Sequence, residues 1–182
     1  MNDSARDNPL ESRLVHDGRI VRLSLDTVRY PDGSTGELEM VRHSGAAAVV
    51  PIVEGGGRSE PAVILVRQYR YAADGYLLEI PAGRPDREGE PWEVCARREL
   101  EEETGLVAGR LERLGAIYTT PGFTDEMIHI FRATELREGS VSRDRDEFIE
   151  VQEVPISRIL AMIASGEITD AKTICGLHLA TA

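Results

Sequence analysis

The sequence has few cysteines and no long hydrophobic run. Its two cysteines, Cys95 and Cys175, are too few and too isolated for a disulfide framework or a thiolate metal site, which favours a reducing cytoplasm. No segment approaches the ~18 consecutive apolar residues that a membrane helix needs. The polar, acidic residues 1–10 lack the apolar stretch of a secretion signal. We therefore expect neither secretion nor membrane insertion.

The sequence also has fewer basic than acidic residues. Lys and Arg number 21 against 32 Asp and Glu, so the formal net charge is −11. Such a surplus of negative charge repels phosphate backbones and anionic lipids. The composition thus argues against a nucleic-acid or membrane partner, and a small phosphate ligand would need local arginines or a metal ion.

The remaining composition is that of a globular protein. Hydrophobic residues make up 41% and charged residues 29% of 182 residues, which fits one domain, with or without a short appendage. Residues 1–12 are expected to form a polar tail, and Asp32-Gly33 a hairpin turn. Apolar patterning predicts strands at 19–29, 37–42, 46–53, 62–66, 77–80, 114–118, 127–133 and 149–154, and helices at 91–104, 156–165 and 171–179. The strand 19–29 should bury the side that carries Leu23 and Leu25, and the charged residues 138–147 should form a loop. This order predicts an α/β or α+β sandwich.

The segment 83–106 carries the chemical signal. Within its predicted helix, Glu99, Glu102 and Glu103 are spaced i, i+3, i+4 and share one face. Like charges four residues apart destabilise a helix by ~0.2–0.5 kcal/mol, and carboxylates are unfavourable in the last turn, here just before Gly105. A bound divalent cation removes both penalties. Oxygen ligands without nearby Cys or His favour Mg²⁺ or Mn²⁺ over Zn²⁺.

This segment resembles the Nudix box, G-x5-E-x7-R-E-U-x-E-E-x-G-U. The second half matches residue for residue, from Glu90 through Arg98 to Leu106. The first half departs from the pattern, because six residues instead of five separate Gly83 from Glu90. The resemblance implies an α/β/α sandwich with a mixed sheet, preceded by a small N-terminal antiparallel β-domain.

The resemblance also assigns roles within the box. Glu99 and Glu103 would be the principal metal ligands, together with the carbonyl of Ala82. Glu102 would bind another ion or activate water, and Arg98 would orient a glutamate through a salt bridge. The implied enzyme is a pyrophosphohydrolase in which water attacks a diphosphate, with Mg²⁺ as cofactor and Mn²⁺ able to substitute.

Further residues resemble the ADP-ribose pyrophosphatase branch of the family. Pro121 lies sixteen residues after Gly105, a spacing that marks this branch. The turn that it opens includes Gly122, Phe123 and Glu126, and the resemblance makes these candidates for substrate binding, with Glu126 contacting ribose hydroxyls.

Three arginines are candidates for contacts with the substrate. Arg42 matches an arginine used in this branch for phosphate or adenine contact, and Arg67 and Arg70 follow a buried strand. An arginine of this kind alone is more often a surface residue than a ligand, and Arg70 is the strongest candidate for the phosphates.

A further acid is expected from the loop before the strand at 149–154. Members of this branch use such an acid to complete the metal site or to deprotonate the water. Glu147 matches best, with Asp144 and Asp146 as alternatives.

The sequence therefore predicts two domains, residues 1–43 and residues 44–182. In this branch the small β-domain is exchanged between two subunits, which implies a homodimer. The predicted reaction is hydrolysis of ADP-ribose to AMP and ribose 5-phosphate. Alternatives are another nucleotide sugar or dinucleotide, such as GDP-mannose or NADH, or a Nudix module that senses a ligand without turnover.

Overall fold

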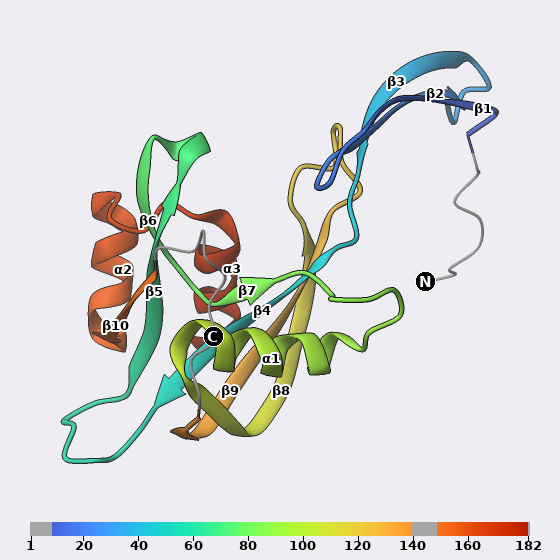
Figure 1. Ribbon diagram of the computed structural model, residues 1–182. Helices are drawn as coiled ribbons and strands as arrows, with labels where there is room; N and C mark the ends of the chain where they lie inside the picture. The colour runs from blue at the N-terminus through green and yellow to red at the C-terminus, as the bar shows by residue number, and fades with distance from the viewer. Residues whose placement is uncertain (1–8, 140–148, 182) are drawn as a thin grey trace. The chain divides into compact units, whose positions relative to one another are not determined.

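The computed structural model describes residues 9–139 and 149–181, and its chain divides into two compact units (Figure 1). The first unit comprises the chain up to Ser44 together with Tyr118–Glu126, and the second comprises Gly45–Ile117 and the chain from Met127 onward. The strands are β1 Glu11–Asp17, β2 Arg22–Arg29, β3 Thr35–Arg42, β4 Ala46–Val53, β5 Ala62–Arg70, β6 Gly75–Glu79, β7 Ala82–Gly83, β8 Leu106–Tyr118, β9 Met127–Glu138 and β10 Ile149–Pro155. The helices are α1 Trp92–Thr104, α2 Ile156–Ser165 and α3 Ala171–Thr181, with a 3₁₀ turn at Tyr71–Ala73.

The first unit is a three-stranded antiparallel sheet in the order β1-β2-β3. The predicted hairpin turn is confirmed: Gly33 has φ 88°, a conformation that suits glycine, and its N–H donates to the carbonyl of Tyr30 at 2.9 Å. The small antiparallel β-domain at the N-terminus is therefore present.

Two expectations for this sheet were wrong. β1 begins at Glu11, inside the predicted tail, and every one of its residues is exposed, so hydrogen bonds to β2 hold it without a hydrophobic pattern. In β2 the buried residues are Ser24 and Asp26, whereas Leu23 and Leu25 are only half-buried.

The second unit contains a seven-stranded mixed sheet. Its main path is β10-β5-β4-β9-β8, with β6 paired to β5 and β7 paired to β4. β4 and β9 run parallel, and β4 is antiparallel to β5 and β7. Mixed pairing of this kind confirms the predicted α/β class.

Both faces of the central strand β4 are covered by helices, which explains its uninterrupted apolar sequence. On one face Ala48, Val50 and Ile52 pack in a core with residues of α2 and α3. On the other face Ala47 and Val49 pack against α1 (Figure 1). The result is a helix–sheet–helix sandwich.

Helix α1 follows its predicted bounds closely. Pro91 precedes the first helical residue, and Gly105 ends the helix with φ 73° and donates its N–H to the carbonyl of Glu101 at 2.8 Å. α2 coincides with its prediction. β8 starts eight residues earlier than expected, and β9 extends to Glu138 in the predicted loop, whose residues 140–147 lie outside the described part of the chain. Among the described helices, none has both the length and the apolar character needed to cross a membrane.

Candidate active site

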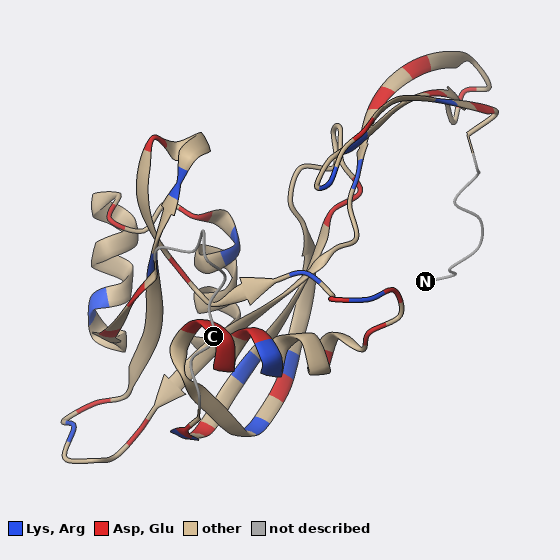
Figure 2. Cartoon of the chain, in the orientation of Figure 1, with Lys and Arg blue, Asp and Glu red and all other residues tan. Residues whose placement is uncertain are grey.

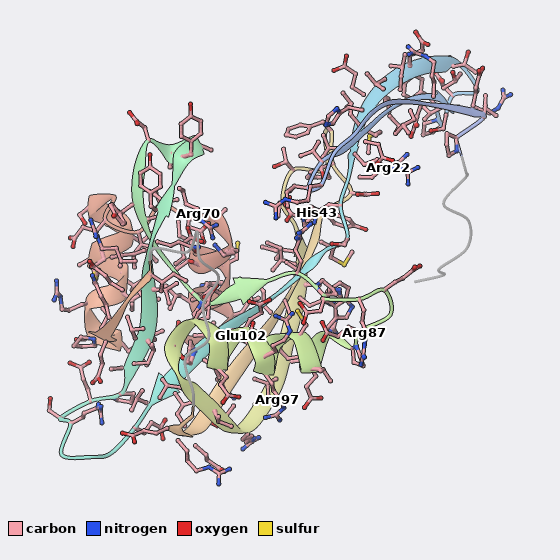
Figure 3. All side chains as sticks on the ribbon, in the orientation of Figure 1. Arg22, His43, Arg70, Arg87, Arg97 and Glu102 are labelled. Carbon is pink, nitrogen blue, oxygen red and sulfur yellow. The ribbon has the colours of Figure 1, made fainter. Side chains whose placement is uncertain are left out.

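The acids of the box lie in the C-terminal half of α1, next to arginines of the same helix (Figure 2). Glu99 is 8% exposed and Glu103 only 3% exposed, and both face the interior of the second unit. Glu102 is more open, with 36% of its side chain exposed, and Figure 3 shows its place on the helix. Burial of an ionised carboxylate is costly unless positive charge or hydrogen bonds compensate.

Arg98 is shared by four carboxylates. It donates to Glu99 and to Glu102, both at 2.8 Å, and it lies 3.1 Å from Asp86 and 3.5 Å from Glu90. Burial disfavours the charged guanidinium, but the charge of Glu99 and the hydrogen bonds to Glu102 and Glu99 outweigh this and raise the pKa of Arg98. The single positive charge of Arg98 thus faces four carboxylates, so the cluster has an excess of negative charge.

The extra residue in the first half of the box is accommodated in the loop before α1. The Glu90 carboxylate, only 6% exposed, accepts the N–H of Asp86 at 3.0 Å and also contacts Arg98. Glu90 therefore joins this loop to the helix.

The strand β7 brings main chain against the acidic helix. Gly83 pairs with Ala47, and Ala82 pairs with Ala48. A Cβ atom added at Gly83 would lie 2.1 Å from the Cδ atom of Glu99, so the glycine leaves the space that this carboxylate fills. Glu99 therefore lies next to Gly83, the residue that follows Ala82, whose carbonyl is predicted to join Glu99 in the metal site.

These donors fit a hard divalent cation. They are carboxylate and carbonyl oxygens, and the one arginine among them serves four acids. Within residues 9–139 and 149–181, no three His, Cys, Asp or Glu side chains are already gathered in a metal-binding arrangement. The loop acids Asp144, Asp146 and Glu147 lie outside these residues.

Arg67 and Arg70 lie on opposite faces of β5, because their positions along the strand differ by three, an odd number. Arg70 donates to Glu79 through Nε at 2.7 Å and Nη2 at 2.8 Å. This hydrogen bonding, opposed by burial and assisted by the charges of Glu79 and Glu103, raises the pKa of Arg70. Arg67 instead pairs with Glu150 at 3.3 Å and stacks over the Tyr76 ring at 3.8 Å. Arg70 is thus electrostatically linked to Glu103 of the acidic helix.

Arg42, at the end of β3, is held by two acids of the first unit. It forms ion pairs with Asp26 and, at 3.4 Å, with Asp125, whose other oxygen accepts the N–H of His43 at 2.8 Å. Burial works against ionisation of Asp26, but hydrogen bonds from Ser12 and Ser24 and the charge of Arg42 lower its pKa.

The Pro-Gly turn lies in the same unit as Arg42. The carbonyl of Phe123 accepts the N–H of Val41 at 2.7 Å, and Glu126 accepts a hydrogen bond from Thr119 Oγ1 at 2.8 Å. Phe123 is 52% exposed, and an added Cβ at Gly122 would meet no atom within 4 Å. The unit thus brings together Arg42, Phe123 and Glu126 and leaves open space at Gly122.

Asp26, Asp125 and Glu79 were not predicted from the sequence as partners of Arg42 and Arg70. A buried acid in an apolar strand, such as Glu79 at the end of Tyr76-Leu77-Leu78, is a signal that such a partner exists. The strand pattern does not say which arginine it binds.

A surface cavity of about 550 Å³ lies between β4, β8 and β9 in the second unit. Its lining contains none of the predicted site residues, so it is not the site described above.

The chain belongs to the Nudix family, since residues 42–176 match the model of the NUDIX domain. It is 38% identical over 172 residues to the ADP-ribose pyrophosphatase of Bacillus subtilis (strain 168), covering 93% of this chain and 90% of that protein. The resemblance to the family and to its ADP-ribose pyrophosphatases is confirmed.

Other relatives carry different names. A methanol dehydrogenase activator of Bacillus methanolicus is 38% identical over 171 residues, with 93% of this chain and 89% of that protein covered. A GDP-mannose pyrophosphatase of Salmonella typhimurium is 42% identical over 129 residues, 66% of each chain.

The fold has a counterpart among solved structures. A crystal structure of an ADP compounds hydrolase matches 97% of this chain and 94% of its own, with a TM-score of 0.80 and 23% identity. At this identity the likeness establishes the Nudix fold alone.

Proposed function

We propose that this Nudix pyrophosphohydrolase cleaves ADP-ribose to AMP and ribose 5-phosphate with Mg²⁺ as cofactor, which Mn²⁺ can replace. The observation that carries the proposal is the pair of buried acids, Glu99 and Glu103, with the Glu99 carboxylate packed against Gly83. The identity to an ADP-ribose pyrophosphatase over nearly the whole chain supports this substrate.

In the proposed reaction the oxygen of water bonds to one phosphorus, and the bridging P–O bond breaks. Glu99, Glu103 and the Ala82 carbonyl would hold the divalent ion, which when bound neutralises charge on the phosphate oxygens. Arg98 keeps Glu99 and Glu102 in place through its two 2.8 Å hydrogen bonds. The water proton passes to Glu102 or to Glu147, and the one that does not accept it remains a ligand.

Six residues are proposed to bind the substrate. Arg70 is proposed to contact the diphosphate, because it is already near the charge of Glu103. Arg67 and Arg42 are proposed as further phosphate or adenine contacts, and both are occupied by acids in the isolated chain. Gly122, Phe123 and Glu126 are proposed to line the terminal ribose pocket.

We further propose that the first unit is completed by a second copy of the chain. Three-stranded sheets need a packed hydrophobic face for stability, yet the apolar residues of this unit are largely open. Their exposed fractions range from 36% to 55% for Leu10, Leu14, Val15, Ile20, Val21, Tyr30 and Leu38. A homodimer that buries these side chains has twice the single-chain mass in light scattering. Location in a reducing cytoplasm stays a prediction.

The main alternative is a different nucleoside diphosphate derivative, such as GDP-mannose, which the name of one relative specifies. Comparison of kcat/KM across ADP-ribose, GDP-mannose and NADH separates these substrates. A sensing module without turnover is disfavoured, because a sensor has no need of Glu99, Glu102 and Glu103 together.

The test of the proposed function is Glu103→Gln, which removes one charge and keeps the side-chain shape. We expect loss of metal-dependent hydrolysis of ADP-ribose with the fold intact by circular dichroism. Glu101→Gln is the matched control, since it makes the same change on the same helix outside the predicted ligand set. An unchanged rate in Glu103→Gln refutes the assignment.

A further inference from the structure

Lys172 is the only lysine of the chain, and the other 20 of its 21 basic residues are arginines. Only 11% of its side chain is exposed. It lies in the first turn of α3, the end of a helix at which the dipole disfavours a cation. A sequence that uses arginine at every other basic position thus keeps one lysine where its side chain is largely covered and the helix dipole disfavours its charge.

Two acids explain how Lys172 is held there. Its ammonium contacts the carboxylate of Glu79 and lies 3.0 Å from Asp170 Oδ2. The same Asp170 oxygen accepts the N–H of Thr173 at 2.9 Å and its hydroxyl at 2.6 Å, which caps the helix. Lys172 is therefore fixed between the start of α3 and the end of β6.

Glu79 connects this lysine to Arg70. Glu79 is 1% exposed, and its carboxylate receives a two-pronged hydrogen bond from Arg70 Nε and Nη2 in addition to the contact with Lys172. Arg70 Nη1 makes no hydrogen bond to a described residue, and 41% of the side chain is exposed. The guanidinium is thus clamped along one edge and open along another.

The geometry also explains why this position needs a lysine. The planar fork of Arg70 already occupies one side of the Glu79 carboxylate. A compact ammonium with three donors can reach the remaining lone pairs and Asp170 at once, whereas a second rigid fork needs a flat, unobstructed approach.

The start of α3 also makes a hydrogen bond close to a predicted metal ligand, Ala82. Thr173, which is fully buried, accepts the N–H of Ile80 at 2.8 Å through its hydroxyl. Ile80 is two residues before Ala82. The start of α3 therefore fixes both Arg70 and the strand that leads to Ala82.

From these contacts we infer that Lys172 is a positioning residue, which through Glu79 holds the Arg70 guanidinium ready for a phosphate oxygen of a nucleoside diphosphate substrate. The inference rests on the proposed hydrolysis of ADP-ribose. Preorganisation of this kind lowers the entropy lost on binding, so its removal weakens substrate binding more than the chemical step.

The test is a double-mutant cycle of Lys172→Met and Arg70→Met, with kcat and KM for ADP-ribose measured separately in Mg²⁺. We expect Lys172→Met to raise KM about tenfold with kcat changed less than about threefold. When Arg70 is already methionine, the Lys172 substitution should change KM by less than about twofold. Arg58→Met, which breaks the exposed Arg58–Glu153 ion pair, is the control and should leave both constants unchanged.

If Lys172→Met raises KM by the same factor in the presence and in the absence of Arg70, the inference is wrong, but the proposed function is not affected. No turnover by the wild-type protein refutes both. Because there is one lysine, ¹³C-lysine labelling also gives a single ε-methylene NMR signal in the unmutated protein. We expect inorganic pyrophosphate to shift this signal in the wild type and not in Arg70→Met; no shift in the wild type, or the same shift in both, contradicts the inference.

Discussion

The close packing of Gly83 against Glu99 makes Gly83→Ala a sharp test of the proposed metal site. Gly83 does not have a positive φ, so alanine is compatible with its backbone conformation. The added methyl group, however, would lie 2.1 Å from Glu99 Cδ and Oε1 and 2.4 Å from Oε2. The substitution thus acts on one carboxylate and not on the strand.

The size of the displacement follows from these distances. Ordinary contact begins at about 3.4 Å, so the Glu99 carboxylate has to move by roughly 3.4 − 2.1 = 1.3 Å. Because a flexible side chain can give way, we expect a stability loss of about 1 kcal/mol, at the low end for an added core methyl group. A misplacement of about 1 Å can cost ~100-fold in rate. Activity should therefore fall far more than stability.

The assay compares kcat/KM for ADP-ribose across a Mg²⁺ titration with thermal unfolding of the same protein. Gly115→Ala is the matched control, because its added Cβ would meet Leu179 Cδ1 at an ordinary 3.8 Å. We expect Gly83→Ala to lose about 100-fold in kcat/KM and to need more Mg²⁺. Wild-type activity and Mg²⁺ dependence in Gly83→Ala would show that the position of Glu99 is irrelevant to catalysis.

Three further predictions concern Cys95, Glu79 and Gly122. Burial, with the charge of Glu99, raises the pKa of Cys95 to about 12, so iodoacetamide at pH 8 should label Cys95 only after unfolding; rapid labelling of the native protein contradicts this. Burial opposes ionisation of Glu79, but Arg70 and Lys172 hold its pKa below 4.5; the stability that this adds is present above about pH 4.5 and is lost as pH falls through the lower folded value. Urea unfolding at several pH values should therefore show a shallower acid dependence for Glu79→Gln than for the wild type, and equal slopes are the contrary result. Gly122→Ala meets no neighbour, so its stability should stay within about 0.5 kcal/mol while KM for ADP-ribose rises; an unchanged KM removes Gly122 from the substrate site.

The elements with strong local signals could be predicted from the sequence. Short local patterns define two of them: the apolar run of β4, and Pro91 and Gly105 at the ends of α1. The structure has both elements where these patterns predict them. β1 could not be predicted, because its residues are all exposed and main-chain pairing with β2 holds it. β8 was predicted too short for a similar reason, since its first half mixes charged residues and Gly109 with apolar ones.

The candidate site also has a part that could be predicted from local sequence and a part that could not. Its acidic helix is visible as a spacing within one helix turn. The partners of its basic residues cannot be read from the sequence in this way, because Arg42 and Asp125 are 83 positions apart and Lys172 and Glu79 are 93 positions apart. Pairings at such separations depend on the fold, and no local pattern of residues encodes them.

The division of the chain has a consequence for anyone who shortens this protein. The N-terminal unit is not one continuous stretch, because it also includes Tyr118–Glu126, which follows a long segment of the second unit. The polypeptide therefore passes between the units three times. Deletion of everything before Gly45 would strip the Phe123 carbonyl of the Val41 amide and Asp125 of Arg42. The remaining chain would keep Tyr118–Glu126 without the strand that this segment contacts, and we therefore do not expect it to fold as an independent Nudix domain.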